Sequence, residues 1–152
     1  MTAPRTPPQD LFLVVSEPIE PATLLREAAS PASGAVVSFL GSVRSPNRGD
    51  VVHHIDYEGY GSMMVAEMER LCAEARARHP LARVVMAHRL GRLAAGEISL
   101  AVVVSSAHRH AALQACAEMV EALKARLPVW KFEAGAAGGA FVPGRADAGP
   151  TL

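Results

Sequence analysis

Apolar residues follow two different periods along this chain, and these periods predict where its strands and helices lie. Short continuous runs of apolar and β-branched residues indicate strands that are buried in a sheet. We expect strands at Leu11–Ile19, Gly34–Val43, Val51–Tyr60, Ala82–Gly91 and Ile98–Ala107, with the buried character clearest at Gly34–Val43.

Other segments repeat their apolar residues at steps of three and four, which is typical of amphipathic helices. A short helix is predicted at Pro21–Ser30, and a long one at Ser62–Arg78. A third helix begins at His108 and carries one apolar stripe, made of Ala112, Cys116, Met119, Val120, Leu123 and Leu127. Pro128 cannot continue this helix, so the residues after it are expected to be extended.

The order of these elements predicts the fold class. Strands and helices alternate imperfectly, and several neighbouring strands are joined by links too short for a crossover, such as Arg92–Glu97. This favours an α+β fold, with a mostly antiparallel sheet and two main helices in a single domain. The domain is expected at residues 11–133, after a disordered segment 1–10 and before a glycine-rich, irregular and mobile tail 134–152.

Composition argues against several classes of protein. Fifteen basic and fifteen acidic residues give a net charge of zero, which disfavours a nucleic-acid binder that relies on an overall positive field. No apolar run approaches the roughly 20 residues of a membrane span, and no signal-peptide core precedes the N-terminal prolines. Cys72 and Cys116 lie on apolar helix faces, so we expect core thiols in a reduced, cytoplasmic protein.

The start of the third helix carries charges that oppose the helix dipole. His108 and Arg109 place cations at the N-terminus, where an anion is favoured. Ser105 and Ser106 add hydroxyl groups at the same junction, beside backbone N–H groups without partners in the helix. The pattern predicts an anion pocket at this helix start.

Three further basic residues allow two interpretations each. Lys124 borders the apolar stripe. Its side chain either extends past the core into solvent or belongs to a functional site. Arg44 opens a loop directly after a buried strand, as a solvated arginine or as a site residue. His88 either lines a site or caps a sheet.

Trp130 is expected to be packed, and Lys131 and Phe132 are expected on alternate sides of the extended segment around it.

Other familiar sites find no support. The adjacent pair His53-His54 points to opposite faces of its strand and cannot easily share one ion, so no metal is expected. The chain contains no phosphate-binding Walker loop, no GxGxxG and no GxSxG.

Five motifs together are more specific than any one of them: "GAVVSFLGSVR", "YEGY", "HRLGRL", "VVVSSAHRHAAL" and "LKARLPVWKFE". In this order, over Gly34–Glu133, the chain resembles the catalytic (large) subunit family of molybdopterin synthase, which has an α/β hammerhead fold. That family converts cyclic pyranopterin monophosphate into the dithiolene molybdopterin. Its sulfur arrives on the Gly-Gly thiocarboxylate tail of a small ubiquitin-like subunit. The resemblance implies no cofactor and a homodimer of large subunits within a heterotetramer.

The resemblance also implies the site. Lys124 and Lys131 would be catalytic, and the substrate-binding residues would be Phe39, Ser42, Val43, Arg44, His108, Arg109, Lys124, Lys131, Phe132, Glu133 and Arg145. The chain departs from the family pattern at Phe132, where a polar or basic residue is usual, and at Phe141, where tryptophan often stands.

Two anions would meet in this site, the cyclic phosphate and the thiocarboxylate, and the cations would accommodate them. His108 and Arg109 would hold the phosphate, with His108 as an alternative acid in opening it. Lys124 would lie beside the tail carbonyl, and Lys131 would assist proton transfer or position the substrate. Two other functions stay open: a non-catalytic docking module for a Gly-Gly tail, and a phosphate-ligand enzyme without a protein partner.

Overall fold

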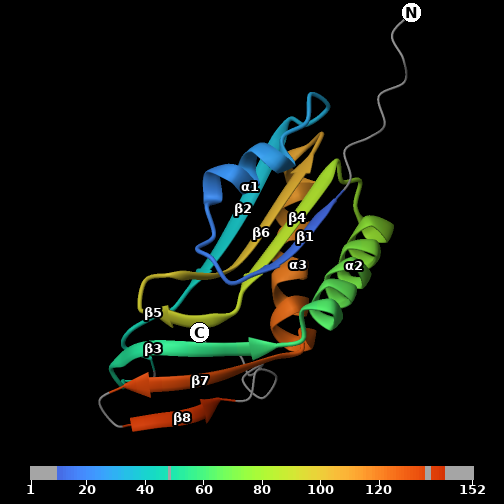
Figure 1. The fold of residues 1–152 in the computed structure, drawn as a ribbon. Coiled ribbons are helices and arrows are strands. Elements are labelled where there is room, and N and C mark those ends of the chain that lie inside the picture. Colours follow the sequence, from blue (N-terminus) through green and yellow to red (C-terminus); the bar gives the residue numbers. More distant parts are fainter. Residues whose placement is uncertain (1–9, 48, 136–137, 143–152) are drawn as a thin grey trace, which may run out of the picture.

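The computed structural model describes residues 10–47, 49–135 and 138–142, and it folds them into two sheets and three helices (Figure 1). The helices are α1 (Pro21–Ala28), α2 (Gly61–Arg78) and α3 (Arg109–Arg126). The strands are β1 (Leu11–Val15), β2 (Ala35–Ser42), β3 (Val52–Gly59), β4 (Arg83–Arg89), β5 (Gly91–Ala94), β6 (Ile98–Ser106), β7 (Val129–Gly135) and β8 (Gly138–Val142).

The first sheet has the strand order β1-β4-β6-β2, and its two central strands are buried on both faces. Only the β1–β4 pair is parallel among the strand pairs of the described residues. Helix α1 lies on one face, and α2 and α3 lie on the other (Figure 1). Because side chains alternate along a strand, Val84 and Met86 pack toward α2 and α3, while Val85 and Ala87 pack toward α1.

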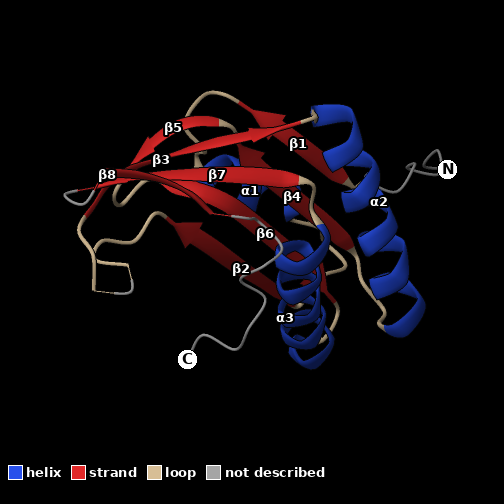
Figure 2. Cartoon of the chain, turned by 90° about the horizontal axis from the view of Figure 1, so that it is seen from below, coloured by secondary structure: helices blue, strands red, loops and turns tan. Residues whose placement is uncertain are grey.

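The second sheet has the order β5-β3-β7-β8 and runs across one end of the first (Figures 1 and 2). Its inner face packs through Ile55, Tyr57 and Leu93. No helix in the described part of the chain covers its outer face, where Trp130 is 39% exposed and meets the Tyr60 ring in a T-shaped arrangement with the centroids 6.0 Å apart. The expectation that Trp130 would be packed is therefore wrong, because this strand faces the core with alternate residues only.

The predicted elements are confirmed in kind, with ends that shift by a few residues. The structure adds two short strands that the sequence pattern did not predict. β5 occupies the segment Gly91–Ala94, which was expected to be a link, and β8 occupies part of the tail that was expected to be irregular. Both are edge strands that pair through their backbones with β3 and β7, so neither needs a long apolar run to form. Within the described residues no helix is long and apolar enough to cross a membrane.

Asp10 ties the start of β1 to the rest of the domain. Its carboxylate accepts hydrogen bonds from Arg76 at 2.6 and 2.9 Å, from the Val84 N–H at 2.9 Å and from the Cys72 thiol at 3.3 Å. Burial alone would raise the pKa of Asp10, but the hydrogen bonds from Arg76 and Val84 outweigh it and lower the pKa below 3.8. One acidic side chain thus joins β1, α2 and β4.

We expect Asp10→Asn to lower the free energy of unfolding by about 2 kcal/mol, because hydrogen bonds to a charged group are lost. The lowered pKa sets the pH dependence: the contribution is complete above pH 3.8 and disappears as the pH falls through the lower folded value. Urea unfolding at pH 7 and pH 3 measures both, with the exposed Glu69→Gln as the control. A difference between wild type and Asp10→Asn that does not shrink at pH 3 would contradict this account.

Candidate active site

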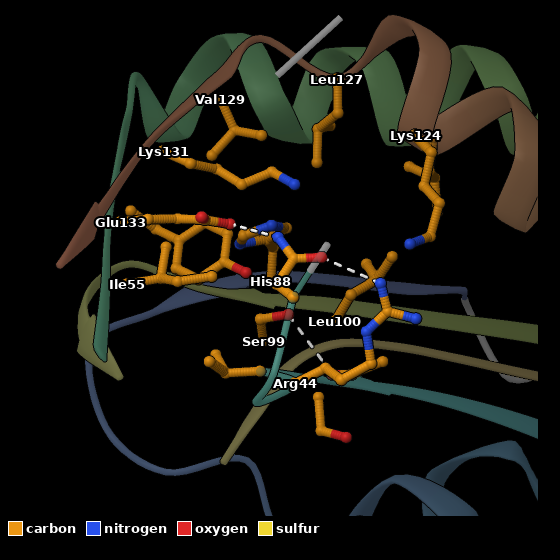
Figure 3. Close-up of a pocket in the computed structure, with 16 residues that line it drawn as sticks. Arg44, Ile55, His88, Ser99, Leu100, Lys124, Leu127, Val129, Lys131 and Glu133 are labelled. Carbon is orange, nitrogen blue, oxygen red and sulfur yellow. Dashed lines mark hydrogen bonds between the residues drawn. The ribbon is translucent and has the colours of Figure 1, made fainter. Parts of the chain in front are cut away.

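A cavity of about 420 Å³ lies where the two sheets meet, beside the C-terminal end of α3 (Figure 3). Its walls come from the end of β2 and the loop after it, from β3 and β7, from the adjoining ends of β4 and β6, and from the last turn of α3. This volume falls within the range of pockets that hold small molecules. The junction brings together segments that are far apart in the sequence.

Three cations reach this cavity from three different elements. Arg44 comes from the loop after β2, Lys124 from the last turn of α3, and Lys131 from β7, and their side chains point into the same space (Figure 3). The proline break makes this possible, because α3 ends at Arg126 and β7 turns back across the cavity from Val129. The site therefore suits an anionic ligand.

Lys124 and Lys131 are the only lysines in the whole chain. Apart from histidines, all its other basic residues are arginines. Both lysines line this one cavity. A lysine is a compact point charge that can exchange a proton, whereas an arginine stays charged. The cavity thus contains both lysine side chains, which combine a positive charge with the capacity for proton exchange.

The floor of the cavity is polar but uncharged. His88 is 4% exposed, and its Nδ1–H donates a hydrogen bond to the carbonyl oxygen of Arg89 at 2.9 Å, which leaves Nε2 as an acceptor. The pKa of His88 is lowered to about 4, chiefly by burial and also by the charges of Lys131 and Lys124, while the backbone hydrogen bond opposes the shift. Its ring meets Tyr57 edge to face, with the centroids 5.4 Å apart. His88 is thus neutral at neutral pH and lines the site.

Tyr57 and Ser99 complete this floor. Burial raises the pKa of the Tyr57 hydroxyl, the hydrogen bond with Ser99 opposes the rise, and the charge of Glu133 adds to it. Ser99 also lies 3.3 Å from the carbonyl oxygen of Gly41, to which its hydroxyl donates. Because Tyr57 and His88 are neutral, they offer hydrogen bonds to a ligand and add no negative charge that would compete with an anionic ligand for the cations.

Glu133 is the acidic residue of the cavity wall, and Asn47 connects it to Arg44. Arg44 Nη2 donates to Asn47 Oδ1 at 2.9 Å, and Asn47 Nδ2 donates to Glu133 Oε1 at 2.7 Å. Ser42 and Val43 line the cavity next to this chain of hydrogen bonds. Five of the predicted substrate-binding positions besides Lys124 thus lie together: Ser42, Val43, Arg44, Lys131 and Glu133.

Phe39 and Phe132 do not line the cavity. Phe39 packs against the large core on β2, and a methyl group at Gly41 would come within 3.2 Å of its ring. The ring therefore lies just behind the bare backbone of Gly41, which is part of the wall. Phe132 is 42% exposed and points away from the site, because it alternates with Lys131 and Glu133 along β7.

His108 and Arg109 lie at the other end of α3, so one chain does not bring them to its own cavity. His108 is the N-cap, Arg109 is the first helical residue, and both are exposed. At 1.5 Å per residue, Arg109 and Lys124 are about 22 Å apart along the axis. The helix start has no acidic residue in its first turn and no side-chain cap, but the buried Ser105 and Ser106 hydroxyls donate to the carbonyl oxygens of Arg83 and Pro80 and so do not serve the predicted anion pocket. Arg145 falls outside the described residues, and Phe141 belongs to β8.

Several residues of this site were not predicted from the sequence. Asn47 stood in a segment read only as a loop, and Ser99 was one of many small polar residues. Tyr57 lay within the "YEGY" motif without a role of its own. Only the motif could have pointed to Tyr57, because the other two become significant through partners far away in the sequence.

The two cysteines are core residues, as expected. Both are buried and unpaired, and burial raises the pKa of Cys72 to about 12 and that of Cys116 to about 11. A thiol that stays protonated is a poor nucleophile. No group of three or more potential ligands that could hold a metal ion occurs among residues 10–47, 49–135 and 138–142.

Comparison with known proteins identifies the family. The sequence profile of the MoaE protein family matches residues 14–126. The chain belongs to the MoaE family. The molybdopterin synthase catalytic subunit of Pyrococcus abyssi is 45% identical over 105 residues, covering 69% of this chain and 71% of that protein.

Two solved structures share the fold. Molybdopterin synthase from Staphylococcus aureus superposes with a TM-score of 0.81 at 29% identity, over 85% of this chain and 94% of the other. A complex of subunits 1 and 2 of the molybdopterin-converting factor from Helicobacter pylori matches with a TM-score of 0.72 at 21% identity, over 86% and 89%. The resemblance drawn from the five motifs is confirmed, and so is the α+β fold class.

Family membership also confirms that the chain is an enzyme subunit of the molybdopterin synthase type. This result weighs against the docking module that the sequence had left open. The cavity agrees with it, because a module that only holds a slender tail needs no set of converging cations.

Proposed function

We propose that this chain transfers sulfur from the thiocarboxylated Gly-Gly tail of a small ubiquitin-like subunit to cyclic pyranopterin monophosphate, and so forms the dithiolene of molybdopterin. The observation that carries the proposal is the convergence of Arg44, Lys124 and Lys131 on one cavity in a chain of the MoaE family. Both reactants are anionic, and a site for them requires several cations at close quarters.

The positions of the two lysines support different roles. Lys124 stands at the edge of the cavity on α3, where it would meet the tail carbonyl and stabilise the negative charge that develops as sulfur leaves the acyl carbon. Lys131 reaches in from β7 beside Glu133, where it would position the pyranopterin or move a proton. His88, neutral and deep in the cavity, offers an acceptor for a donor group of the substrate.

A small subunit is the proposed protein partner, and the two different subunits in the Helicobacter pylori structure support this choice. We also propose that two copies of this chain pair within a heterotetramer. His108 and Arg109 lie about 22 Å from Lys124 along α3, so they join a phosphate site at the cavity only if a second copy supplies them. Two buried thiols without a disulfide bond suit a reducing compartment, and this supports a cytoplasmic location.

Purified components test the proposal directly. With cyclic pyranopterin monophosphate alone, the chain should form no dithiolene, because both of its thiols are buried. A partner that ends in an ordinary Gly-Gly carboxylate should bind and still yield no product. The same partner as a thiocarboxylate should yield molybdopterin, measured as dithiolene formation. If this complete mixture makes none, the sulfur-transfer function is wrong and a docking role replaces it.

Lys131→Ala separates chemistry from docking in the same mixtures. We expect dithiolene formation to fall while the complex with the partner persists on gel filtration, because Lys131 lies inside the cavity and not on its outer surface. If the variant loses the complex as well, Lys131 belongs to the tail-binding surface.

A further inference from the structure

Arg44 and Glu133 carry opposite charges in the wall of the same cavity, yet an amide stands between them (Figure 3). Asn47 accepts from Arg44 at 2.9 Å through Oδ1 and donates to Glu133 at 2.7 Å through Nδ2. The ion pairs found within the described residues do not include Arg44 with Glu133. The carboxylate is therefore held without neutralising the guanidinium.

The orientation of the Asn47 amide follows from its partners. A guanidinium has donors only, and an ionised carboxylate has acceptors only, so Oδ1 must face Arg44 and the amino group must face Glu133. Of the side chains of this size, only an asparagine serves both partners at once. An aspartate at this position could accept from Arg44 but could not donate to Glu133.

The loop that carries Asn47 is held in place by its own backbone. The Asn47 N–H donates to the Asp50 carbonyl at 2.8 Å, and the Asp50 N–H donates back to Asn47 at 3.0 Å. Gly49, with a φ of 84°, allows the tight turn between them. Ser45 Oγ accepts from the Val52 N–H at 3.0 Å and fastens the loop to β3. Asn47 is thus fixed before any ligand arrives.

Arg44 uses one N–H group on Asn47 and has further donors in its planar fork. Held from one side by a neutral acceptor, it keeps its full positive charge toward the cavity, where Lys124 and Lys131 also point. A direct pair with Glu133 would instead bind the guanidinium to a carboxylate and weaken its hold on an incoming anion.

We infer that Asn47 is a positioning residue, which aims Arg44 at an anionic ligand in the cavity and keeps Glu133 from neutralising it. The inference deepens the proposed sulfur transfer and rests on it only for the kinetic measurements below.

The first measurement needs no turnover. The probe is inorganic phosphate, titrated into the full-length chain while the Arg44 Nε–H signal is followed by NMR, with the signal assigned by its loss in Arg44→Ala. We expect Asn47→Asp, which has nearly the same shape, to require at least about tenfold more phosphate for the same shift, a loss of about 1.4 kcal/mol. Glu133→Gln is the comparison variant: Asn47 can still donate to its side-chain carbonyl oxygen, and one negative charge leaves the wall, so it should need no more phosphate than wild type.

The double variant N47D/E133Q distinguishes a charge role from a purely structural one. The new amide at position 133 can donate to the new carboxylate at position 47, so the hydrogen bond between the loop and β7 returns, but this carboxylate now contacts Arg44. We expect the double variant to regain the melting temperature of wild type and to keep the weakened phosphate response. If the response returns together with the melting temperature, Asn47 is only a structural link and the inference is wrong.

In the complete mixture, Asn47→Asp should raise the KM for the pyranopterin by at least about tenfold and change kcat by less than about threefold, because a binding interaction is lost. An unchanged KM together with an unchanged phosphate response would overturn the inference and leave the sulfur-transfer function intact. If wild type itself makes no dithiolene, the proposed function fails, and the phosphate titration still decides the role of Asn47.

Discussion

Replacing Lys124 by alanine is expected to reduce dithiolene formation at least about 100-fold and to leave the fold intact. Removal of one group that stabilises a developing negative charge typically costs two to three powers of ten in rate, about 2.7–4 kcal/mol. The Lys124 side chain is exposed in the last turn of α3, so its loss removes little packing. The free energy of unfolding should change by less than about 1 kcal/mol.

Two measurements on the same preparation check this result: product formation in the complete mixture, and urea unfolding of the isolated chain. Gln114→Ala is the matched control, because Gln114 is exposed on the same helix and does not line the cavity. Lys124→Arg keeps the positive charge without the compact ammonium group, and it tests whether charge alone suffices. A Lys124→Ala variant that turns over at the wild-type rate would exclude a catalytic role for Lys124.

The second large effect concerns His88 and pH. The pKa of His88 falls from the ordinary 6.5 to about 4, chiefly because the ring is buried, and also because Lys131 and Lys124 are near. Between these two values the unfolded chain binds a proton that the folded chain excludes. The free energy of unfolding should therefore fall as the pH is lowered from 6.5 toward 4, by at most about 1.4 kcal/mol per pH unit.

His88→Gln isolates this contribution from that of the carboxylates, which titrate in both proteins. Urea unfolding at intervals from about pH 7.5 to about pH 4.5 should give two curves that run parallel above pH 6.5, the ordinary pKa of histidine. Below it, wild type should lose stability faster than the variant. If the curves stay parallel throughout, His88 takes up its proton in the folded chain, and its ring is not held neutral in the cavity.

The elements with long apolar patterns could be predicted from the sequence, and those that depend on pairing could not. The apolar stripes of α2 and α3 and the buried runs of β4 and β6 repeat over many residues, so local pattern and tertiary packing agree. β5 and β8 are short and rich in glycine and alanine, and backbone hydrogen bonds to β3 and β7 hold them. Trp130 is half exposed because it points to the outer face of the second sheet. The residues around it in the sequence do not indicate which face of the sheet is covered.

The candidate site divides in the same way. Lys124 and Lys131 stand near one another in the sequence around Pro128, and the motifs around them indicate the catalytic subunit family of molybdopterin synthase, which the MoaE match confirms. The motifs also named His108 and Arg109, but α3 carries these two away from the cavity of their own chain. A sequence motif indicates which residue types belong to a site. The length of the helix that carries them decides how far apart they lie in space.

By itself, the sequence determined the family, the helices, the central strands and the lysine pair, because these depend on local period and on residues close together along the chain. Only the tertiary structure decided that Asn47 connects Arg44 to Glu133, 86 residues further along the chain. It also decided that His88 is a neutral acceptor, since burial and two lysines from other elements lower its pKa. A hydrogen bond or a shifted pKa depends on distances between side chains, and folding sets those distances when the two sheets meet.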